Sequence, residues 1–399
     1  MNYKLINHDI LYNDEPLGLY PMHLFKKVDR PTNNIPGPVK KRSQLESASS
    51  LAKQGVYGEK IKKESVHVIE KYPIGAALFE VRNHIKKIKE VKNAVTPARA
   101  PIPSDPKVLS RHFKSLGYFL GADLMGVCRI PSYAMYLDDE FGNPLNVSFE
   151  YAIVFVLRKH LGTTLASSGF DWIFDSCSIQ TYQLLAVWTE TVANYIRRLG
   201  YEAEASNMRN YLNLMPPLLL EAGIGEISRM SLVVNPFFGG NFKSAAVLTN
   251  LPLYPEKPID FGLQEYCSNC TICADKCPSG AISFGNKELF NGYETWKLDK
   301  EKCIRFSRLN KKGSVCGKCT RLCPWNRPDS QPHHFTSWDG DINEFYKSIN
   351  KRADLLRKNN YIDPSEYTQK WWFDLEYIDG ELVIPKTSLD KVKLVDRTN

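Results

Sequence analysis

The sequence contains no long hydrophobic run, and this excludes a membrane-spanning helix as its organising element. The longest apolar stretches, such as YAIVFVL at 151–157, are much shorter than the roughly 20 residues that a helix needs to cross a bilayer. The opening residues, MNYKLINHDILYNDEP, contain neither an apolar segment nor a twin-arginine pair before one, so they do not resemble an export signal. We therefore expect a soluble, cytoplasmic protein without a membrane partner.

An excess of charge of one sign is also missing. The 399 residues include 52 Lys and Arg against 44 Asp and Glu, which gives a net charge of +8. The positive excess is spread along the chain, with local enrichment at 40–42 and 86–92. Because lysine runs are usually solvated faces, the composition gives no support for a nucleic-acid partner.

The ten cysteines are few for this length, but eight of them stand in two ordered runs. The first run, Cys-x2-Cys-x2-Cys-x3-Cys-Pro, begins at Cys267, and the second, Cys-x12-Cys-x2-Cys-x3-Cys-Pro, begins at Cys303. This is the pattern of a bacterial ferredoxin with two 4Fe-4S clusters, in which the fourth cysteine of each run ligates the other cluster. We therefore expect one cluster on Cys267, Cys270, Cys273 and Cys323, and the other on Cys277, Cys303, Cys316 and Cys319.

Other uses of cysteine fit the pattern less well. Zinc sites draw four ligands per ion, usually from separate pairs rather than from a triplet with a trailing Cys-Pro. Disulfides form in oxidising compartments, and no export signal is present. The two remaining cysteines, Cys128 and Cys177, lie in apolar or helical contexts and are expected to be buried small side chains.

The order of the predicted elements indicates an α/β protein. Residues 1–106 are polar and rich in proline, and we interpret them as an arm or covering layer with one helix near 75–91. Residues 107–261 form the predicted core, 262–328 the cluster domain, and 329–399 a C-terminal segment that packs on the core. Within the core we expect helices at 107–120, 178–199 (ended by Gly200) and 206–220, and strands within 120–130 and at 151–157, 230–236 and 244–251.

From about residue 107 to about 375, the sequence resembles the cobalamin-dependent reductive dehalogenases of the soluble, non-respiratory type. The resemblance is carried by LGADLMGV, the helix that leads to LGY, AGIGE, NPFFG, YETWKLDKEKC and WWFDLE, together with both cysteine runs. It implies a nitroreductase-like core that binds cobalamin, with the two-cluster ferredoxin-like domain inserted. No histidine lies in an Asp-x-His-x-x-Gly motif, which fits a cobalamin bound base-off.

The resemblance also implies a reaction. Co(I) cobalamin would remove halide from an organohalide, such as a halogenated phenol or aromatic acid. Electrons would pass through the two 4Fe-4S clusters from an external donor such as a ferredoxin or flavodoxin system, and a tyrosine would donate the proton.

Particular residues follow from the resemblance by position. The proton donor corresponds to Tyr182, nineteen residues before the Tyr of LGY, and its cationic partner corresponds to Lys243, seven residues after the Pro of NPFFG. The other implied residues are Arg305 and Arg308 for the substrate, Gly239, Gly240 and Asn241 for the cofactor, and Asn207 or Asn210 as a candidate active-site asparagine.

Two other functions remain open at this point. Epoxyqueuosine reductases, which act on tRNA, also use cobalamin and two 4Fe-4S clusters, and a CPW sequence occurs in their second cysteine run as it does here. A non-enzymatic electron-transfer subunit would need the clusters alone, but it would leave the large segment before Cys267 without a role. The positions of Tyr182 and Lys243 favour the dehalogenase.

Overall fold

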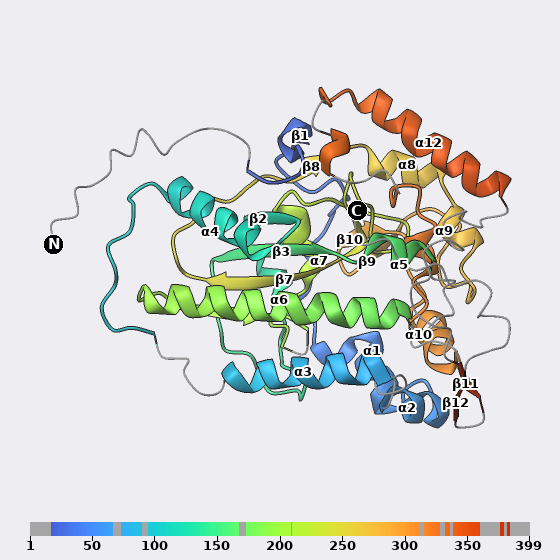
Figure 1. Ribbon diagram of the computed structural model, residues 1–399, viewed down its shortest axis with the longest axis horizontal. Coiled ribbons are helices and arrows are strands. Elements are labelled where there is room, and N and C mark those ends of the chain that lie inside the picture. The colour runs from blue at the N-terminus through green and yellow to red at the C-terminus, as the bar shows by residue number, and fades with distance from the viewer. Residues whose placement is uncertain are drawn as a thin grey trace.

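A four-stranded antiparallel sheet forms the centre of the molecule, in the order β2-β3-β7-β4 (Figure 1). Its strands are β2 (Leu124–Arg129), β3 (Tyr151–Arg158), β4 (Ala203–Ser206) and β7 (Phe242–Thr249). The computed structural model describes residues 17–66, 73–89, 95–166, 173–208, 210–310, 315–327, 332–335, 338–359, 376–378 and 381–383.

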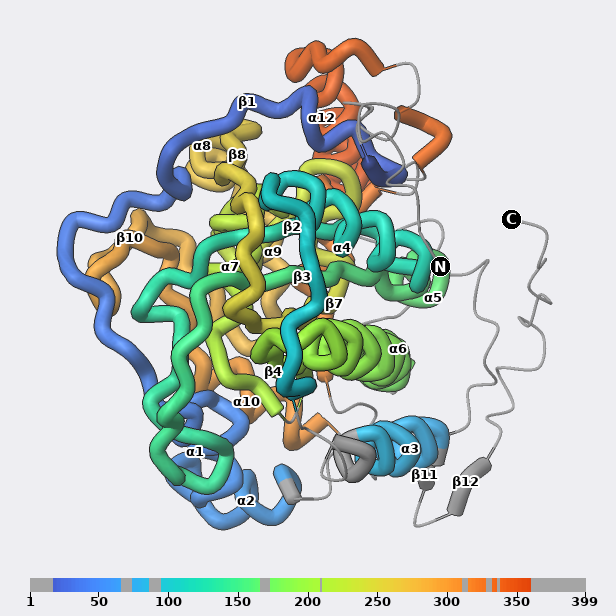
Figure 2. The backbone as a smooth tube through the Cα atoms, turned by 90° about the vertical axis from the view of Figure 1, so that its left-hand side faces the viewer, coloured from blue at the N-terminus to red at the C-terminus, as the bar shows by residue number. Residues whose placement is uncertain are grey.

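Helices cover both faces of this sheet (Figure 2). The side chains of β3 alternate between two apolar clusters, so that Ile153 and Phe155 pack on one side and Val154 and Val156 on the other. This burial on both faces explains the unbroken apolar run that predicted the strand. The helices α4 (Pro106–Leu120) and α6 (Ile173–Arg198) cover the first face, and α7 (Met215–Glu221) contacts the second.

The long helix α6 was expected from 178 to 199 and begins earlier, at Ile173, while Gly200 follows it with a φ of 84°. The helix predicted near 75–91 is α3 (Pro73–Lys89). It packs along the outer side of α6, away from the sheet (Figures 1 and 2). The N-terminal segment therefore contributes a third layer to this side of the molecule.

Two predicted elements of the core were wrong in extent. The helix expected over 206–220 is confined to α7, because β4 still includes Ser206 and the helix begins only where Pro216 and Pro217 occupy its first turn. The strand expected at 230–236 is reduced to β6 (Val233–Val234), which pairs with β5 (Glu226–Ile227) outside the main sheet. The mixed α/β fold is confirmed, and the boundaries proposed for the individual domains stay predictions.

The cysteine-rich segment lies at one end of the sheet and is built from short elements (Figure 1). Its elements are α8 (Leu263–Asn269), α9 (Ile272–Asp275), β9 (Glu288–Phe290), β10 (Tyr293–Thr295), α10 (Lys300–Leu309) and α11 (Lys318–Arg321), and α12 (Ile342–Lys358) packs beside them through Ala353 and Leu356. The remaining short elements are η4 (Ser132–Ala134), α5 (Leu161–Ala166), η5 (Pro332–Phe335) and the hairpin β11 (Glu376–Ile378)–β12 (Glu381–Val383).

The N-terminal segment runs across the core and the cysteine-rich segment. It pairs β1 (Lys26–Lys27) with β8 (Ile259–Asp260), and Asn34 accepts a backbone hydrogen bond from Glu294 in β10. Its other elements are η2 (Met22–Leu24), η3 (Gln44–Glu46), α1 (Ala48–Gln54) and α2 (Glu59–Val66), of which α1 and α2 contact α10.

Trp371 and Trp372, part of the WWFDLE sequence, lie outside the described residues. Among the residues that are described, no helix combines the length and apolar character that crossing a membrane requires.

Candidate active site

The eight cysteines of the two runs gather into two neighbouring groups in the fold. Burial is the main cause that raises the pKa of the Cys323 thiol, and the charges of Cys267, Cys273 and Cys270 raise it further. Burial likewise raises the pKa of the Cys316 thiol to about 12, and the charges of Cys319, Cys303 and Cys277 contribute to this increase. Cys323 and Cys316, each with its three cysteine neighbours, make up the two sets of four that the sequence predicts.

The grouping defines which thiols face one another, and their role as ligands stays a prediction. Among the described residues, no three His, Cys, Asp or Glu side chains approach closely enough to share a single metal ion. Two sets of four thiols are the donor number that two 4Fe-4S clusters require. The residues present therefore fit two clusters.

A buried arginine from the core holds the loop of the first thiol group. The Nε atom of Arg229 donates to the carbonyl oxygens of Cys267 (2.9 Å) and Cys270 (3.2 Å). Its Nη1 atom donates to the carbonyl oxygens of Ser283 (2.9 Å) and Gly285 (3.0 Å). The sequence offers no signal for this residue, because the contacts join the turn after β5 to a loop more than thirty positions later.

A cavity of about 480 Å³ lies between the core and the second thiol group. All four cysteines of that group, and none of the first, are among its lining residues. Its lining residues also include Tyr182 from α6 and Lys243 from β7. Tyr182 and Lys243, which the family resemblance implies as proton donor and cation, therefore line the same cavity as the four cysteines of the second predicted cluster.

Tyr182 and Lys243 meet because α6 packs directly on β7. The ammonium nitrogen of Lys243 lies 4.9 Å from the centroid of the Tyr182 ring. A cation at this distance from a phenol ring is attracted to the ring. The pair therefore places a phenol and an amine side by side in the wall of the cavity.

Two further side chains of this cavity were not predicted. Tyr211, from the loop between β4 and α7, lines it next to Tyr182. Lys159 lines it as well, and its ammonium nitrogen lies 3.9 Å from the centroid of the Phe174 ring. Burial lowers the pKa of Lys159 well below its usual value, and the charge of Lys243 lowers it further.

The three residues proposed for cofactor binding occupy different surroundings. Gly240 lines the cavity. Gly239 instead packs against the second cysteine run, where a Cβ atom would lie 2.7 Å from the backbone nitrogen of Asn326. Asn241 is fully buried, and its side-chain nitrogen donates to the carbonyl oxygen of Lys159 at 3.2 Å. Of the three, Gly240 is the residue that can touch a ligand in this cavity.

The two arginines proposed for the substrate do not line the cavity. Arg305 points to solvent from α10, where its Nη2 atom pairs with Glu301 at 2.7 Å. Arg308 is buried in the same helix, and burial lowers its pKa while the charges of Asp175 and Cys303 oppose that shift. Among the described residues of α10, Cys303, Phe306 and Ser307 form this part of the wall instead.

The two candidate asparagines lie behind the cavity rather than on its wall. Asn207 is buried and accepts a hydrogen bond from Arg82 Nη2 at 2.8 Å. The side chain of Asn210 donates to the carbonyl oxygen of Ala205 at 2.9 Å. Both contacts are structural, and neither asparagine is among the residues lining the cavity.

A second and larger cavity, of about 930 Å³, adjoins the first. The two share four lining residues, Tyr136, Leu214, Pro216 and Leu298. Drug-sized ligands occupy pockets of about 300–1,000 Å³, so the two cavities together suit a larger ligand. No histidine is among the described residues that line either cavity.

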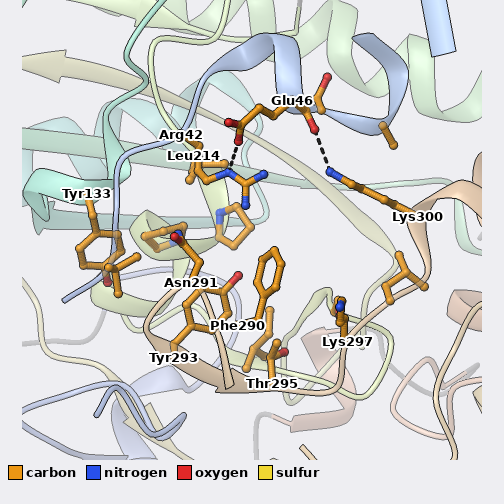
Figure 3. Close-up of a pocket in the computed structure, with 18 of the residues that line it drawn as sticks. Arg42, Glu46, Tyr133, Leu214, Phe290, Asn291, Tyr293, Thr295, Lys297 and Lys300 are labelled. Carbon is orange, nitrogen blue, oxygen red and sulfur yellow. Dashed lines mark hydrogen bonds and ion pairs between the residues drawn. The ribbon is translucent and has the colours of Figure 1, made fainter. Parts of the chain in front are cut away.

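The larger cavity is enclosed by the N-terminal segment on one side and the β9–β10 hairpin on the other (Figure 3). Arg42 pairs with the Glu46 carboxylate, and the Lys300 ammonium donates to the Glu46 carbonyl oxygen at 2.9 Å. Phe290 and Tyr293 contribute aromatic rings to the opposite wall (Figure 3). The cavity can therefore hold an aromatic group together with an anionic group.

Comparison with known proteins first identifies the cysteine-rich segment. A model of the 4Fe-4S dicluster domain family matches residues 266–327, which confirms the predicted two-cluster segment. A tetrachloroethene reductive dehalogenase of Sulfurospirillum multivorans is 29% identical over 287 residues, which are 62% of this chain and 56% of that protein. The chain spans about half the length of such curated relatives.

Solved structures extend the similarity to nearly the whole chain. The catabolic reductive dehalogenase NpRdhA in complex with 3-bromo-4-hydroxybenzoic acid superposes with a TM-score of 0.81 at 34% identity, covering 95% of this chain and 55% of that one. A reductive dehalogenase structure that suggests a mechanism for B12-dependent dehalogenation gives a TM-score of 0.80 at 34% identity, with 96% and 55% covered. An epoxyqueuosine reductase of Escherichia coli strain K12 is 26% identical over 171 residues, or 37% of this chain and 41% of that protein.

Proposed function

Because the chain is a homologue of the reductive dehalogenases, we propose that it removes halide from a halogenated phenol or aromatic acid. The observation that carries this proposal is the meeting of Tyr182 and Lys243 in one cavity with the second thiol group. A proton source and a source of electrons then face the same bound molecule. The overall change is the replacement of a carbon–halogen bond by a carbon–hydrogen bond, with two electrons and one proton consumed and halide released.

Cobalamin fits the two adjoining cavities as the cofactor of this reaction. In the smaller cavity, Gly240 would allow close approach of the corrin, and in the larger one Arg42 and Lys300 would lie near the phosphate of its nucleotide arm. The described lining residues would hold the corrin without an imidazole, because no histidine is among them. When bound, cobalamin supplies the electron transfer that breaks the carbon–halogen bond.

The protein's own part is to hold the substrate and supply the proton. Tyr182 O–H breaks, the proton passes to the carbon that loses halide, and the negative charge stays on the tyrosine oxygen. Lys243 stabilises that charge as a nearby cation. Lys159 adds a buried amine to the wall that can donate a hydrogen bond, and Lys243 supplies the cation that suits an anionic phenolate or carboxylate.

Electrons would come from an external donor, such as a ferredoxin or flavodoxin system. The second thiol group lines the cavity and the first does not, which supports entry of electrons at the first group. Oxygen-sensitive clusters suit a reducing compartment, so we place the protein in the cytoplasm. The shorter and weaker match to epoxyqueuosine reductase makes a tRNA substrate the second candidate.

The test is anaerobic reconstitution with iron, sulfide and cobalamin, followed by incubation with bromophenols and chlorophenols. We expect bromide release by the unaltered protein and at least a hundredfold loss in Tyr182→Phe, the range seen when a general acid is removed. Both should hold eight irons and one corrin per chain. The matched control is Tyr195→Phe, because Tyr195 lies on the same helix and bonds to His112 at 3.2 Å instead of facing the cavity.

Three results would change this conclusion. Full activity of Tyr182→Phe would remove that residue as the proton donor. A cobalt EPR signal that responds to no organohalide, together with turnover of epoxyqueuosine-containing tRNA, would support the second candidate. Reconstitution of the clusters without any uptake of corrin would leave only an electron-transfer role.

A further inference from the structure

A second tyrosine, Tyr211, stands beside the proposed proton donor. Both hydroxyl-bearing rings line the 480 Å³ cavity, although Tyr211 comes from the loop after β4 and Tyr182 from α6. The Tyr211 hydroxyl donates to the carbonyl oxygen of Ser244 at 3.4 Å. Ser244 directly follows Lys243, whose ammonium lies over the Tyr182 ring. The two tyrosines and the lysine are therefore held at the same end of β7.

The loop that carries Tyr211 is fixed by polar contacts that reach across the fold. Arg82, a buried residue of α3, donates to the side-chain oxygen of Asn207 at 2.8 Å. Asn207 in turn donates to the hydroxyl of Thr189 on α6 at 3.2 Å. At the other end of the loop, the backbone N–H of Leu212 donates to the Ser206 hydroxyl at 3.0 Å. Hydrogen bonds therefore hold this loop to both the core and α3.

The N-terminal segment reaches the same loop a second time. The side-chain nitrogen of Gln44, in η3, donates to the carbonyl oxygen of Tyr211. Backbone and side chain of Tyr211 are therefore both constrained, the first by Gln44 and the second by Ser244. A ring held in this way loses little conformational entropy when its hydroxyl turns to a neighbouring acceptor.

The surroundings of Tyr211 favour the protonated phenol. Burial raises its pKa well above the usual value, and the charge of Tyr182 and a hydrogen bond to it raise that pKa further, whereas the charge of Arg82 lowers it. A phenol that keeps its proton can donate a hydrogen bond to a neighbouring oxygen that has lost one. A hydrogen bond to a charged oxygen is stronger than one to a neutral oxygen.

Building on the proposed function, we propose that Tyr211 is a second active-site tyrosine that stabilises the phenolate of Tyr182. When Tyr182 gives its proton to the carbon that loses halide, Tyr211 keeps its own proton and turns its hydroxyl from the Ser244 carbonyl oxygen to the Tyr182 oxygen, to which it donates a hydrogen bond. Tyr211 acts through Tyr182 and is therefore a positioning residue. The N-terminal helix α3 would then take part in the reaction by holding this loop through Arg82.

The experiment compares Tyr211→Phe with the unaltered protein, both loaded with cobalamin and clusters, on a bromophenol. We expect kcat to fall about tenfold, equivalent to about 1.4 kcal/mol, as for loss of one hydrogen bond to a charged group. KM should stay within about twofold, since the phenylalanine keeps the shape of the cavity wall. The solvent deuterium isotope effect on kcat should increase, because proton donation becomes slower than the other steps. Tyr195→Phe should change none of these values.

Two outcomes would overturn the role of Tyr211 while leaving the proposed function intact. One is a Tyr211→Phe variant with unchanged kcat and an unchanged isotope effect. The other is a fall in iron and corrin content that matches the fall in rate, which would make the residue purely structural. If the unaltered protein releases no halide from any bromophenol, the proposed function itself fails and this role fails with it.

Discussion

At the scale of the single residue, Arg229 shows how one buried cation can organise a loop of ligand candidates. Its guanidinium donates to the carbonyl oxygens of Cys267, Ser268 and Cys270 and so fixes the backbone between the first two cysteines. The same charge lowers the pKa of Cys267 against the larger effect of burial, which raises it. Arg229 therefore favours thiolates at the first group, and thiolates are the form that binds iron.

Substitution of one cysteine should abolish one 4Fe-4S cluster and leave the other in place. Cys273→Ala leaves three thiols in the first group and all four in the second, so we expect about four of eight irons to remain after anaerobic reconstitution. Cys128→Ala is the matched control, because Cys128 is also buried but packs in the apolar core beside β3. Iron analysis and cluster absorbance provide the measurement. Eight irons in Cys273→Ala would contradict the assignment of ligands.

A buried tyrosine should limit stability in alkali. Burial raises the pKa of Tyr20 to about 12, although its hydrogen bond with Arg158 and the charge of Arg158 lower it, whereas an unfolded tyrosine titrates near 10. Between pH 10 and 12 the unfolded chain loses this proton and the folded chain keeps it, so the free energy of unfolding falls as pH rises. Below pH 10 this residue gives no such dependence.

The measurement is the urea midpoint of the loaded protein at pH 8, 10 and 11, followed by tryptophan fluorescence. Tyr20→Phe should be less stable at pH 8, because it loses the Arg158 contact, but should lose less further stability above pH 10. Tyr254→Phe, at a side chain that is about half exposed, should keep the original dependence. Equal slopes in all three proteins would exclude Tyr20 as a cause.

Residues in a sequential pattern could be predicted, and residues assembled by tertiary contacts could not. The cysteines follow a ligand spacing, and Tyr182 and Lys243 could be found by counting from LGY and NPFFG. Tyr211 and Arg229 belong to loops without any motif. They reach the site only because β4, β5 and the cysteine-rich segment come together in the folded chain.

At the scale of the element, the NPFFG turn connects the core to the cysteine-rich segment. Asn235 and Gly239 exchange two backbone hydrogen bonds, of 2.9 and 3.0 Å, and the Asn235 side chain accepts from the backbone of Phe237 at 2.9 Å. Gly239 has a φ of 62° and touches the backbone at Trp325 and Asn326. This turn therefore needs glycine both for its conformation and for the close approach.

Substituting Gly239 and Gly280 separately distinguishes the cost of the left-handed backbone from the cost of the close backbone contact. Gly280 has nearly the same φ, 61°, but a Cβ atom there would meet nothing within 4 Å. Gly280→Ala should cost about 1–2 kcal/mol for the left-handed backbone. Gly239→Ala should cost more, because its Cβ would also clash with the backbone of the second cysteine run. The free energies of unfolding of the two cofactor-loaded variants are compared by urea denaturation. Equal losses of stability would mean that the backbone near Asn326 moves to admit the Cβ atom at little energetic cost.

Long elements with a regular pattern were predicted well, whereas the connections between them were not. β3 and α6 are apolar over enough residues to reveal their type and burial. The stretch 207–214 contains Met and Leu at spacings that resemble a helix, yet its described residues lie outside any helix, and Arg82 and Ser206 bond to the Asn207 side chain and to the Leu212 backbone instead. The helical pattern there was overruled by side-chain hydrogen bonds from other elements.

At the scale of the whole molecule, the two joined cavities span three parts of the chain. The core and the cysteine-rich segment enclose the smaller cavity. The N-terminal segment completes the larger one, where Arg42 and Glu46 form part of the wall (Figure 3). A corrin without its nucleotide arm would fill only part of this space. The molecule should therefore distinguish a complete cobalamin from cobinamide, which lacks that arm.

The binding of the two corrinoids can be compared directly by absorbance titration of the apo-corrin protein. We expect cobalamin to bind at least about tenfold more tightly than cobinamide, and Arg42→Met to reduce that ratio because it removes a cation from the larger cavity. Arg357→Met is the control, since Arg357 lies exposed on α12 and pairs with Asp354. Equal affinity for both corrinoids in the unaltered protein would show that the larger cavity does not hold the arm.

The path of the N-terminal segment has a consequence for biosynthesis. The residues that close the larger cavity are synthesised before the surfaces they rest on, because β8, β10 and α10 lie more than two hundred residues further along the chain. The N-terminal segment can therefore dock only after the cysteine-rich segment has been synthesised and folded. Until it docks, the larger cavity lacks the wall that this segment supplies and is open to a large prosthetic group.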